Sequence, residues 1–253
     1  AKVGGIESLV TNLAKSIANE NKIIVLADQQ FPIQDKIFDF QYKDKMKILR
    51  YKGLKFFRRY RKANDIKILL ENKKIDRIIS DTWKSLELCI EDINNKKIPT
   101  LCLVHGNELF YESERKKNRV TKVLKLVDYI VANSNYTKSL VINLGINKKK
   151  IHVINPGAED LRNIENTKKL NIIGDPIVLT LARLEKRKGH ANVIKTIQKL
   201  IINFPKIKYL IAGDGPEKIK LVKQTKKLGL EKNVEFLGNI NNWEKKNVFE
   251  NTD

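Results

Sequence analysis

Hydrophobic and polar positions along the chain follow two alternating periods. Short apolar runs rich in β-branched residues are typical of strands buried in a parallel sheet, and the amphipathic stretches between most of these runs are typical of helices. In the first part of the chain the predicted strands cover residues 23–27, 75–80, 100–104, 129–132 and 151–154. Because strands alternate with helices, the pattern predicts an α/β fold with a parallel sheet covered on both faces.

A second α/β series follows a polar stretch. The chain turns polar after Asn155-Pro156-Gly157. The elements predicted beyond it are a strand over 177–181, a helix over 191–203, a strand over 208–212, a helix over 217–228 and a strand over 234–236. We therefore expect an N-terminal domain over residues 1–157, an interdomain linker over 158–174, and a second, partial domain over 175–253.

The two ends of the chain depart from a complete α/β pattern. At the start, Gly4-Gly5 precede a helical pattern that runs from Ile6 to Ile17 with no strand ahead of it. At the other end, one more helical stretch around Trp243 closes the second series. We therefore expect the sequence to be truncated at both ends. The first strand of the N-terminal domain and the second half of the C-terminal domain would then be missing from it.

Composition places the chain among soluble globular proteins. Of its 253 residues 42% are apolar and 31% are charged, which excludes a disordered chain. No stretch approaches the roughly 20 apolar residues that span a bilayer. The two cysteines, Cys89 and Cys102, lie in apolar surroundings without a C-x-x-C pattern. This use of cysteine suits a reducing cytoplasm and argues against disulfide or zinc chemistry, so both are expected to be buried thiols.

The charge balance is strongly basic. Lys and Arg number 50 against 29 Asp and Glu, a net charge of +21. An excess of this size raises nucleic acid, anionic membranes and phosphorylated substrates as partners. Much of it is lysine interleaved with Asn and Ile, as in residues 147–150, which an AT-biased genome would also encode on an ordinary surface. Both explanations stay open at this point.

The most specific local signal is an anion site in residues 181–190. Arg183 ends a predicted strand, and Lys188-Gly189 follow five residues later at the start of a predicted helix. Arginine bridges two phosphate oxygens, lysine adds a point charge, and the helix contributes free N–H groups. This combination suits a diphosphate. A nucleoside diphosphate that leaves during group transfer gains negative charge, so fixed cations stabilise the transition state. A solvated basic turn is the alternative.

Two further features are candidates for ligand contact. Gly4-Gly5 before a helix allow close approach of the backbone to a phosphate, although such a pair is often only a turn. His105 ends the run over 100–104, at the carboxyl end of a parallel strand, where open α/β sheets bind ligands. A histidine hydrogen-bonded beside the sheet is the alternative. His152 and His190 are expected to be structural.

Other ligand chemistries find no support in the sequence. No Asp-x-Asp occurs, and no histidine has a partner at metal spacing, so we expect no metal site. Gly213-Asp214-Gly215 follow a predicted strand without the third glycine of a dinucleotide-binding fingerprint. The stretch from Lys47 to Lys62, which contains Phe56, Phe57 and Tyr60, is compatible with a helix that lies on an anionic membrane. The pattern slightly favours the alternative, an ordinary surface helix that packs its aromatic residues.

The order of these motifs resembles glycosyltransferase family 4 over nearly the whole chain. The motifs are Gly4-Gly5-Ile6-Glu7, His105-Gly106, residues 133–137 around Ser134, Asn155-Pro156-Gly157, Arg183 with Lys188-Gly189, and Gly213-Asp214-Gly215. The resemblance implies a GT-B fold of two facing Rossmann-like domains. The acceptor would bind the N-terminal domain and the nucleotide sugar the C-terminal domain. Transfer would occur in the cleft with retention at the anomeric carbon and without a metal or other cofactor.

The resemblance also implies roles for particular residues. Arg183 and Lys188 would hold the donor diphosphate, and His105 would contact the transferred sugar, so these three are the catalytic candidates. Gly189 and Gly213 would belong to the donor site with Gly5, and Gly4, Gly5 and Ser134 to the acceptor side. The family's paired glutamates, spaced eight apart in the C-terminal domain, are absent from this sequence. We therefore expect the chain by itself to lack full activity.

The expected function is that of a retaining glycosyltransferase. It would move a sugar from a UDP- or GDP-linked donor to a glycan or lipid-linked acceptor, in cell-surface polysaccharide or glycolipid synthesis at the inner face of the plasma membrane. One alternative is a basic protein that binds nucleic acid or anionic membranes, although its basic residues are dispersed and no nucleic-acid module is recognisable. We expect no nucleic-acid partner. Another is a different GT-B enzyme, such as a nucleotide-sugar epimerase or a phosphorylase.

Overall fold

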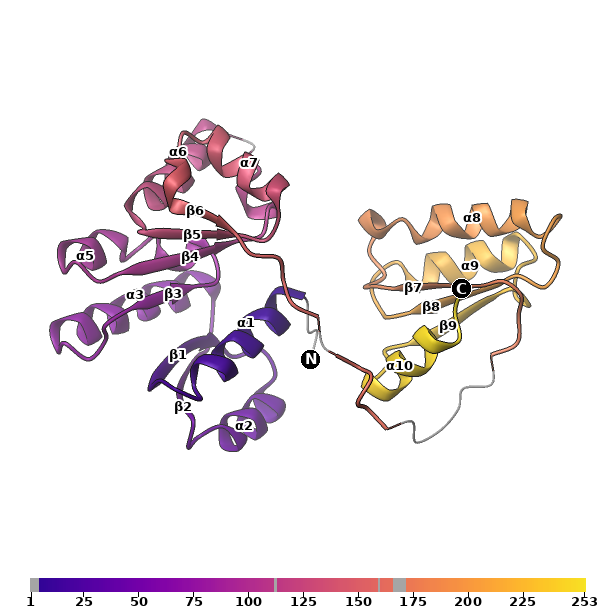
Figure 1. The fold of residues 1–253 in the computed structure, drawn as a ribbon, viewed down its shortest axis with the longest axis horizontal. Coiled ribbons are helices and arrows are strands. Elements are labelled where there is room, and N and C mark those ends of the chain that lie inside the picture. The colour runs from indigo at the N-terminus through magenta and orange to yellow at the C-terminus, as the bar shows by residue number, and fades with distance from the viewer. Residues whose placement is uncertain (1–4, 112, 159, 166–171) are drawn as a thin grey trace. The chain divides into compact units, whose positions relative to one another are not determined.

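The computed structural model describes residues 5–111, 113–158, 160–165 and 172–253 and divides into two compact units (Figure 1). Unit 1 is Ala1–Gly157 and unit 2 is Ala158–Asp253. Each unit has its own hydrophobic core of buried aliphatic side chains. The two units are described separately below.

The described strands of unit 1 form two parallel sheets. In chain order its elements are α1 (Gly5–Ile17), β1 (Ile23–Asp28), α2 (Pro32–Gln41), β2 (Met46–Tyr51), α3 (Lys55–Glu71), β3 (Ile78–Ser80), α4 (Trp83–Leu86), α5 (Ile90–Asn95), β4 (Thr100–Val104), α6 (Glu114–Leu126), β5 (Tyr129–Ala132), α7 (Asn135–Asn143) and β6 (Ile151–Val153). One sheet pairs β1 with β2, and the other has the order β3-β4-β5-β6. Because all pairs are parallel, the carboxyl ends of neighbouring strands lie at the same edge.

The core of unit 1 forms around the four-stranded sheet. Strand β4 is buried along most of its length, as a strand covered on both faces must be, and Cys102 within it is fully buried. Cys89 is buried as well, and both thiols are free, which confirms the prediction of buried cysteines. Burial raises the pKa of Cys89 to about 12 and also raises that of Cys102. Neither thiol is therefore a reactive thiolate near neutral pH.

Unit 2 contains a three-stranded parallel sheet in the described part of the chain. Its elements are β7 (Ile177–Leu181), α8 (His190–Leu200), β8 (Lys208–Ala212), α9 (Lys218–Lys227), β9 (Val234–Gly238) and α10 (Asn242–Glu250). The strand order is β7-β8-β9. Part of the segment that leads into the unit lies on α10, because Lys246 Nζ donates to the carbonyls of Arg162 and Ile164 at 2.9 and 2.7 Å.

The predicted α/β fold with parallel sheets is confirmed in both units. Strands β4, β5, β7 and β8 have the predicted bounds. The strand predicted over 75–80 is shorter, since β3 begins only at Ile78. In the part of the chain that the structure describes, no helix has the length and apolar content that crossing a membrane requires.

The prediction of one helix from Lys47 to Lys62 is wrong in its first part. Residues 46–51 form strand β2, which pairs with β1 in an unbroken six-residue register. Its two end residues, Met46 and Tyr51, are buried, so pairing and burial both favour the strand. The helix begins at Lys55 as α3. The exposed aromatic residues Phe56, Phe57 and Tyr60 lie in its first two turns.

Candidate functional site

A basic loop in unit 2 contains most of the predicted anion site. We call residues 182–189 the arginine loop; it leaves β7 at the carboxyl edge of the three-stranded sheet. Its backbone continues the pairing beyond the strand, since Ala182 N donates to Ala212 O and Leu184 N donates to Asp214 O, both at 3.0 Å. A short 3₁₀ turn over Lys186–Lys188 follows, and Gly189 links it to α8.

The side chains of the arginine loop carry a concentrated positive charge. Arg183 Nη2 lies 3.0 Å from Oε1 of Glu185, and Arg187 Nε lies 2.8 Å from Oε2 of the same carboxylate. The Arg183 side chain is 47% exposed. Lys188 is also exposed, and its ammonium has no ion-pair or hydrogen-bond partner among the residues described. Between residues 183 and 188 four cations share one carboxylate, so the loop has a local charge of +3.

Glycines fix the backbone of this edge. Gly189 has φ +77°, a left-handed conformation that glycine adopts without cost, and it sets the turn from the loop into α8. Gly213 has φ +136°, and a Cβ placed on it would collide with the Ala182 carbonyl group. A Cβ on Gly215 would lie 2.6 Å from Leu184 O. The loop after β8 therefore needs glycine to pass beside the arginine loop, which gives Gly213 a packing role at the site.

His190 begins α8 and is buried directly behind the arginine loop. Its exposed fraction is 2%, and neither ring nitrogen has a hydrogen-bond partner in the described part of the structure. Burial lowers the pKa of His190, and the positive charge of Lys188 lowers it further. The imidazole is therefore held in its neutral form beside the basic loop.

In unit 1, His105 lies at the carboxyl edge of the four-stranded sheet. Its Nε2 is 3.0 Å from the carbonyl oxygen of Asp81, which follows β3. A carbonyl only accepts, so Nε2 is the protonated nitrogen and Nδ1 remains available to a ligand. The His105 backbone is also held, because its N–H donates to Glu108 Oε1 at 2.6 Å and its carbonyl accepts from Asn133 Nδ2 at 3.3 Å.

Ser134 lies at the same edge as His105. Its Oγ caps α7 by accepting from Thr137 N at 3.1 Å, and Thr137 Oγ1 donates to Asn133 Oδ1 at 2.6 Å. Asn133 thus connects Ser134 to His105 through one polar network. Gly5 is the first residue of α1. Gly4 lies outside the described residues.

Comparison with known proteins identifies the family. The sequence model described as Glycosyltransferase Family 4 matches residues 3–160, which is more than half of the chain. The chain belongs to glycosyltransferase family 4. The model described as Glycosyl transferases group 1 matches residues 162–253, so the two matches correspond closely to units 1 and 2.

Two curated relatives of this family 4 chain come from Campylobacter jejuni. One is named N-acetylgalactosamine-N,N'-diacetylbacillosaminyl-diphospho-undecaprenol 4-alpha-N-acetylgalactosaminyltransferase, and it is 31% identical over 59% of this chain and 40% of its own length. The other, named GalNAc-alpha-(1->4)-GalNAc-alpha-(1->3)-diNAcBac-PP-undecaprenol alpha-1,4-N-acetyl-D-galactosaminyltransferase, is 24% identical over 94% of this chain. The match spans 66% of that relative.

Solved structures agree with the GT-B fold. Anabaena Alr3699/HepE in complex with UDP superposes with a TM-score of 0.69 at 18% identity, over 94% of this chain and 67% of that one. At 18% sequence identity, this structural similarity is evidence for the fold alone.

The structure brings the predicted residues of the family 4 chain together in two groups. His105 and Ser134 share the network in unit 1. In unit 2, Arg183, Lys188 and Gly189 lie in the arginine loop, and Gly213 packs beside it at Ala182. Among the described residues, no group of three or more His, Cys, Asp or Glu side chains is placed to hold a metal ion.

Sequence reasoning gave no role to the residues that hold these groups in place, although Asn133 lies in the motif over residues 133–137. Asp81, Asn133 and Glu185 contact the candidates directly. Asp81 and Asn133 each follow a strand at the same edge as His105, and that position is the signal that could have indicated them. Glu185 had no such signal, because one carboxylate among four cations is typical of a solvated turn.

Proposed function

We propose that this family 4 chain acts as a retaining glycosyltransferase that uses a UDP- or GDP-linked sugar donor. The observation that carries the proposal is the arginine loop, a local charge of +3 fixed at the carboxyl edge of the sheet in unit 2. A nucleoside diphosphate is the ligand that suits it. The relatives, which are named as sugar transferases, and a neighbour of the same fold solved with UDP support this choice.

The loop can contribute to catalysis by charge alone. When the bond from sugar to diphosphate breaks, negative charge accumulates on the leaving phosphate oxygens, and cations already in place stabilise that charge without reorganising. Glu185 holds Arg183 in place while leaving about half of its side chain exposed to a ligand. In a front-face reaction the leaving phosphate also helps to deprotonate the acceptor hydroxyl. The mechanism then needs no side-chain nucleophile, metal or other cofactor.

We assign the acceptor to unit 1. His105, with Nδ1 free of the Asp81 contact, is the candidate for the transferred sugar. Ser134 and the start of α1 at Gly5 are the candidates on the acceptor side. The relatives' names specify acceptors linked to undecaprenyl diphosphate, and they support a lipid-linked or glycan acceptor here. We propose that the reaction takes place at the cytoplasmic face of the plasma membrane, in the synthesis of surface polysaccharide or glycolipid.

Nucleotide binding is the first test. The full-length protein that contains this chain is titrated by calorimetry with UDP, GDP and ADP, with and without EDTA, at two salt concentrations. We expect micromolar binding of one nucleotide, unaffected by EDTA, and the nucleotide bound names the donor class. Absence of nucleotide binding, together with salt-sensitive association with nucleic acid or anionic vesicles, would replace the proposal with the alternative of a basic binding protein.

A substitution locates the bound nucleotide. Arg183→Ala removes a charge-assisted contact worth about 1.5–3 kcal/mol, so the nucleotide affinity should fall about tenfold or more. Arg162→Ala is the matched control, because Arg162 is an exposed arginine of unit 2 whose guanidinium pairs only with Asp160 in the described structure. Equal affinities in wild type and Arg183→Ala would remove Arg183 from the site.

A further inference from the structure

Unit 1 contains a second basic site, separate from the His105 network. A pocket of about 370 Å³ lies where the start of α3, the end of α4 and the start of α6 meet. Its lining residues are Phe56, Arg59, Tyr60, Glu87, Leu88, Arg115 and Arg119. We call it the three-arginine pocket.

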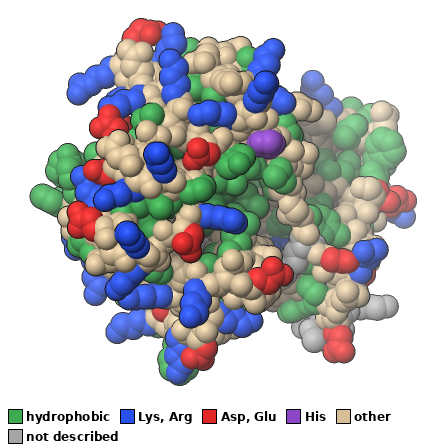
Figure 2. All heavy atoms as spheres, turned by 60° about the vertical axis from the view of Figure 1, so that its left-hand side comes forward, with side chains coloured by type: hydrophobic (Ala, Val, Ile, Leu, Met, Phe, Trp, Pro, Cys, Tyr) green, Lys and Arg blue, Asp and Glu red, His purple; other side chains and the backbone are tan. Residues whose placement is uncertain are grey.

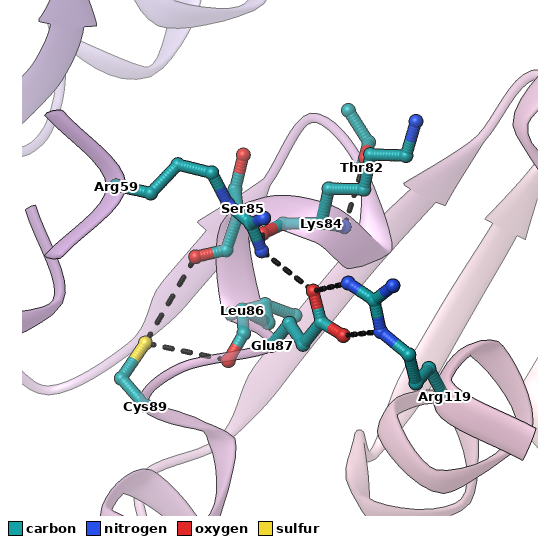
Figure 3. Close-up of polar contacts among 8 residues, drawn as sticks. All are labelled: Arg59, Thr82, Lys84, Ser85, Leu86, Glu87, Cys89 and Arg119. Atoms are coloured by element: carbon teal, nitrogen blue, oxygen red, sulfur yellow. Dashed lines mark hydrogen bonds and ion pairs between the residues drawn. The ribbon is translucent and has the colours of Figure 1, made fainter. Parts of the chain in front are cut away.

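Within this pocket one carboxylate balances two of the three arginines. Glu87 accepts from Arg59 Nη2 at 2.5 Å and from Arg119 Nη2 at 2.8 Å, and Arg119 Nε contacts its other oxygen (Figure 3). The Glu87 side chain is only 13% exposed, so both of its oxygens are occupied within the protein. Burial by itself would raise the pKa of Glu87, but the hydrogen bonds from Arg119 and Arg59 outweigh it and lower the pKa. Glu87 therefore remains charged at neutral pH.

The third arginine is left for a ligand. Arg115 is exposed, in the first turn of α6, and its guanidinium makes no ion pair or hydrogen bond to any residue the structure describes. The lining thus carries a net charge of +2, from three arginines and one glutamate. Lys84 lies next to Arg59, whose Nη2 donates to the Lys84 carbonyl at 3.3 Å.

One wall of the pocket is aromatic and faces solvent. Phe56 and Tyr60 lie one turn apart on α3 with ring centroids 4.6 Å apart, and they are 61% and 51% exposed. Phe57 beside them is 58% exposed. Exposed aromatic rings next to arginines are typical of surfaces that contact the boundary between lipid headgroups and hydrocarbon.

The pocket is also joined to the proposed acceptor side. Arg119 lies over the ring of the buried Trp83, with the guanidinium carbon 5.9 Å from the ring centroid. Trp83 Nε1 donates to Glu108 O at 3.3 Å, and the Glu108 carboxylate accepts from His105 N. Two residues therefore separate the pocket arginines from the His105 backbone.

We propose that the three-arginine pocket binds the phosphate group of a long-chain lipid phosphate or diphosphate. The Arg115 guanidinium contacts the phosphate oxygens, because planar guanidinium groups pair with phosphate in a bidentate manner. Arg59 and Arg119, which Glu87 holds in place, add positive charge beside it. Phe56 and Tyr60 lie against the first part of the hydrocarbon chain. The inference deepens the proposed function, since it supplies a place for the lipid end of an acceptor, but binding to the pocket does not need nucleotide.

Two sources of such a phosphate are possible, the acceptor itself or the bulk phospholipid of an anionic membrane. Co-sedimentation with vesicles in the absence of nucleotide distinguishes them. Three vesicle types are compared: neutral phosphatidylcholine, phosphatidylcholine with phosphatidylglycerol, and phosphatidylcholine with a polyprenyl diphosphate at the same surface charge. Tighter binding to the diphosphate vesicles supports the acceptor as the source, and equal binding to both charged types supports bulk phospholipid.

Matched variants test whether the pocket is responsible. Arg115→Gln removes an exposed cation without disturbing the Glu87 contacts, and vesicle binding should weaken about fivefold or more. Arg77→Gln is the control, because Arg77 is an exposed arginine of the same unit that precedes β3, at the opposite end of that strand from α4. Its binding should stay within about twofold of wild type, as expected for one dispersed surface charge. An equal loss in both variants, or no binding to either charged vesicle, would overturn the proposal.

A soluble probe separates the phosphate contact from the hydrocarbon contact. Inorganic diphosphate should compete with vesicles for wild type, and Arg115→Gln should weaken this competition. Tyr60→Ala should weaken vesicle binding while leaving inorganic diphosphate binding unchanged. Inorganic diphosphate that fails to compete would contradict a phosphate site in the pocket, whatever the outcome of nucleotide binding at the arginine loop.

Discussion

At the scale of single residues, the packing of the arginine loop depends on Gly213, whose lack of a side chain lets the neighbouring backbone approach. Gly213 combines a positive φ with a backbone neighbour that leaves no space for a Cβ. Gly189 has a positive φ as well, but no atom lies within 4 Å of the place its Cβ would occupy. Alanine substitutions at these two positions therefore distinguish the effect of backbone strain from the effect of a steric collision.

We predict that Gly213→Ala destabilises the chain more than Gly189→Ala. Gly189→Ala should cost only the free energy of a left-handed backbone conformation, about 1–2 kcal/mol. Gly213→Ala should have a comparable backbone cost and should also displace the loop that packs on Ala182. The nucleotide affinity of Gly213→Ala should therefore fall as well. Urea unfolding measures the stability and calorimetry the affinity. Gly157→Ala, at an open position without a positive φ, serves as the control. Equal stability of the two loop variants would contradict the packing role.

The buried His190 makes stability depend on pH. Its pKa is lowered in the folded state, so the unfolded chain binds this proton more readily than the folded chain. The contribution of neutral His190 is fully present above the ordinary pKa of 6.5 and is lost as the pH falls through the lowered value.

We therefore predict that His190→Leu flattens the acid side of the stability profile. The free energy of unfolding, measured in urea at about pH 7.5 and about pH 5, should fall less in the variant than in wild type. His152→Leu is the control, because His152 is exposed in β6. A variant that keeps the wild-type dependence on pH would show that His190 does not contribute to it.

At the scale of elements, side-chain caps mark where α4, α6 and α7 of unit 1 begin. Ser134 caps α7 through a hydrogen bond from Thr137 N. Ser134→Ala should cost about 1 kcal/mol of unfolding free energy, because the amide loses its partner. Ser139→Ala within the same helix is the control, since its Oγ donates only to Tyr136 O. Thermal unfolding with both variants measures the difference, and an equal effect would argue against a specific cap at Ser134.

Strands rich in apolar and β-branched residues could be predicted from the sequence. Strands β4, β5, β7 and β8 consist mainly of such residues, and their bounds agree with the structure. Strand β2 was missed because it contains two cations. Arg50 within it is neutralised by Asp39 at 2.6 Å and by Asp35 at 3.5 Å, both on α2. Because the carboxylates that neutralise Arg50 lie on another element, the sequence of β2 alone resembles an exposed surface segment.

The same limit applies to the sites. The arginine loop could be found from the sequence because Arg183, Lys188 and Gly189 lie within seven consecutive residues. The three-arginine pocket could not, since Glu87 lies 28 residues from Arg59 and 32 residues from Arg119. Only the packing of α3, α4 and α6 brings these charges together. The stretch from Lys47 to Lys62 did indicate basic and aromatic character, and the structure assigns its aromatic part to the wall of that pocket.

At the scale of the whole molecule, the net charge of +21 is distributed rather than concentrated. On the face drawn in Figure 2, Lys and Arg side chains are spread among acidic and apolar ones. Dispersed charges of this kind attract anionic surfaces over long distances and are screened by salt. We propose that specific recognition falls to places where the structure fixes cations next to one another, such as the arginine loop and the three-arginine pocket.

Because units 1 and 2 have separate cores, nucleotide should act on them unequally. Arg183, Lys188, Gly189 and Gly213 all belong to unit 2, so a saturating nucleoside diphosphate should stabilise unit 2 against opening. At about a hundredfold excess over Kd the gain is about 2.7 kcal/mol. Hydrogen exchange measured by mass spectrometry should show slower exchange around residues 182–190 and 213–216. In unit 1, we expect any change to be confined to the first turn of α1, where Gly5 is the donor-side candidate.

The Arg183→Ala variant provides the control for this experiment. At the same nucleotide concentration, Arg183→Ala should show the exchange pattern of nucleotide-free wild type, because the variant binds less nucleotide. Protection spread evenly over the cores of both units would mean that nucleotide binding couples them into one cooperative folding unit. Protection centred on the three-arginine pocket would move the nucleotide from unit 2 to unit 1. Each pattern assigns the diphosphate to a different set of arginines, so a single experiment distinguishes the two basic sites.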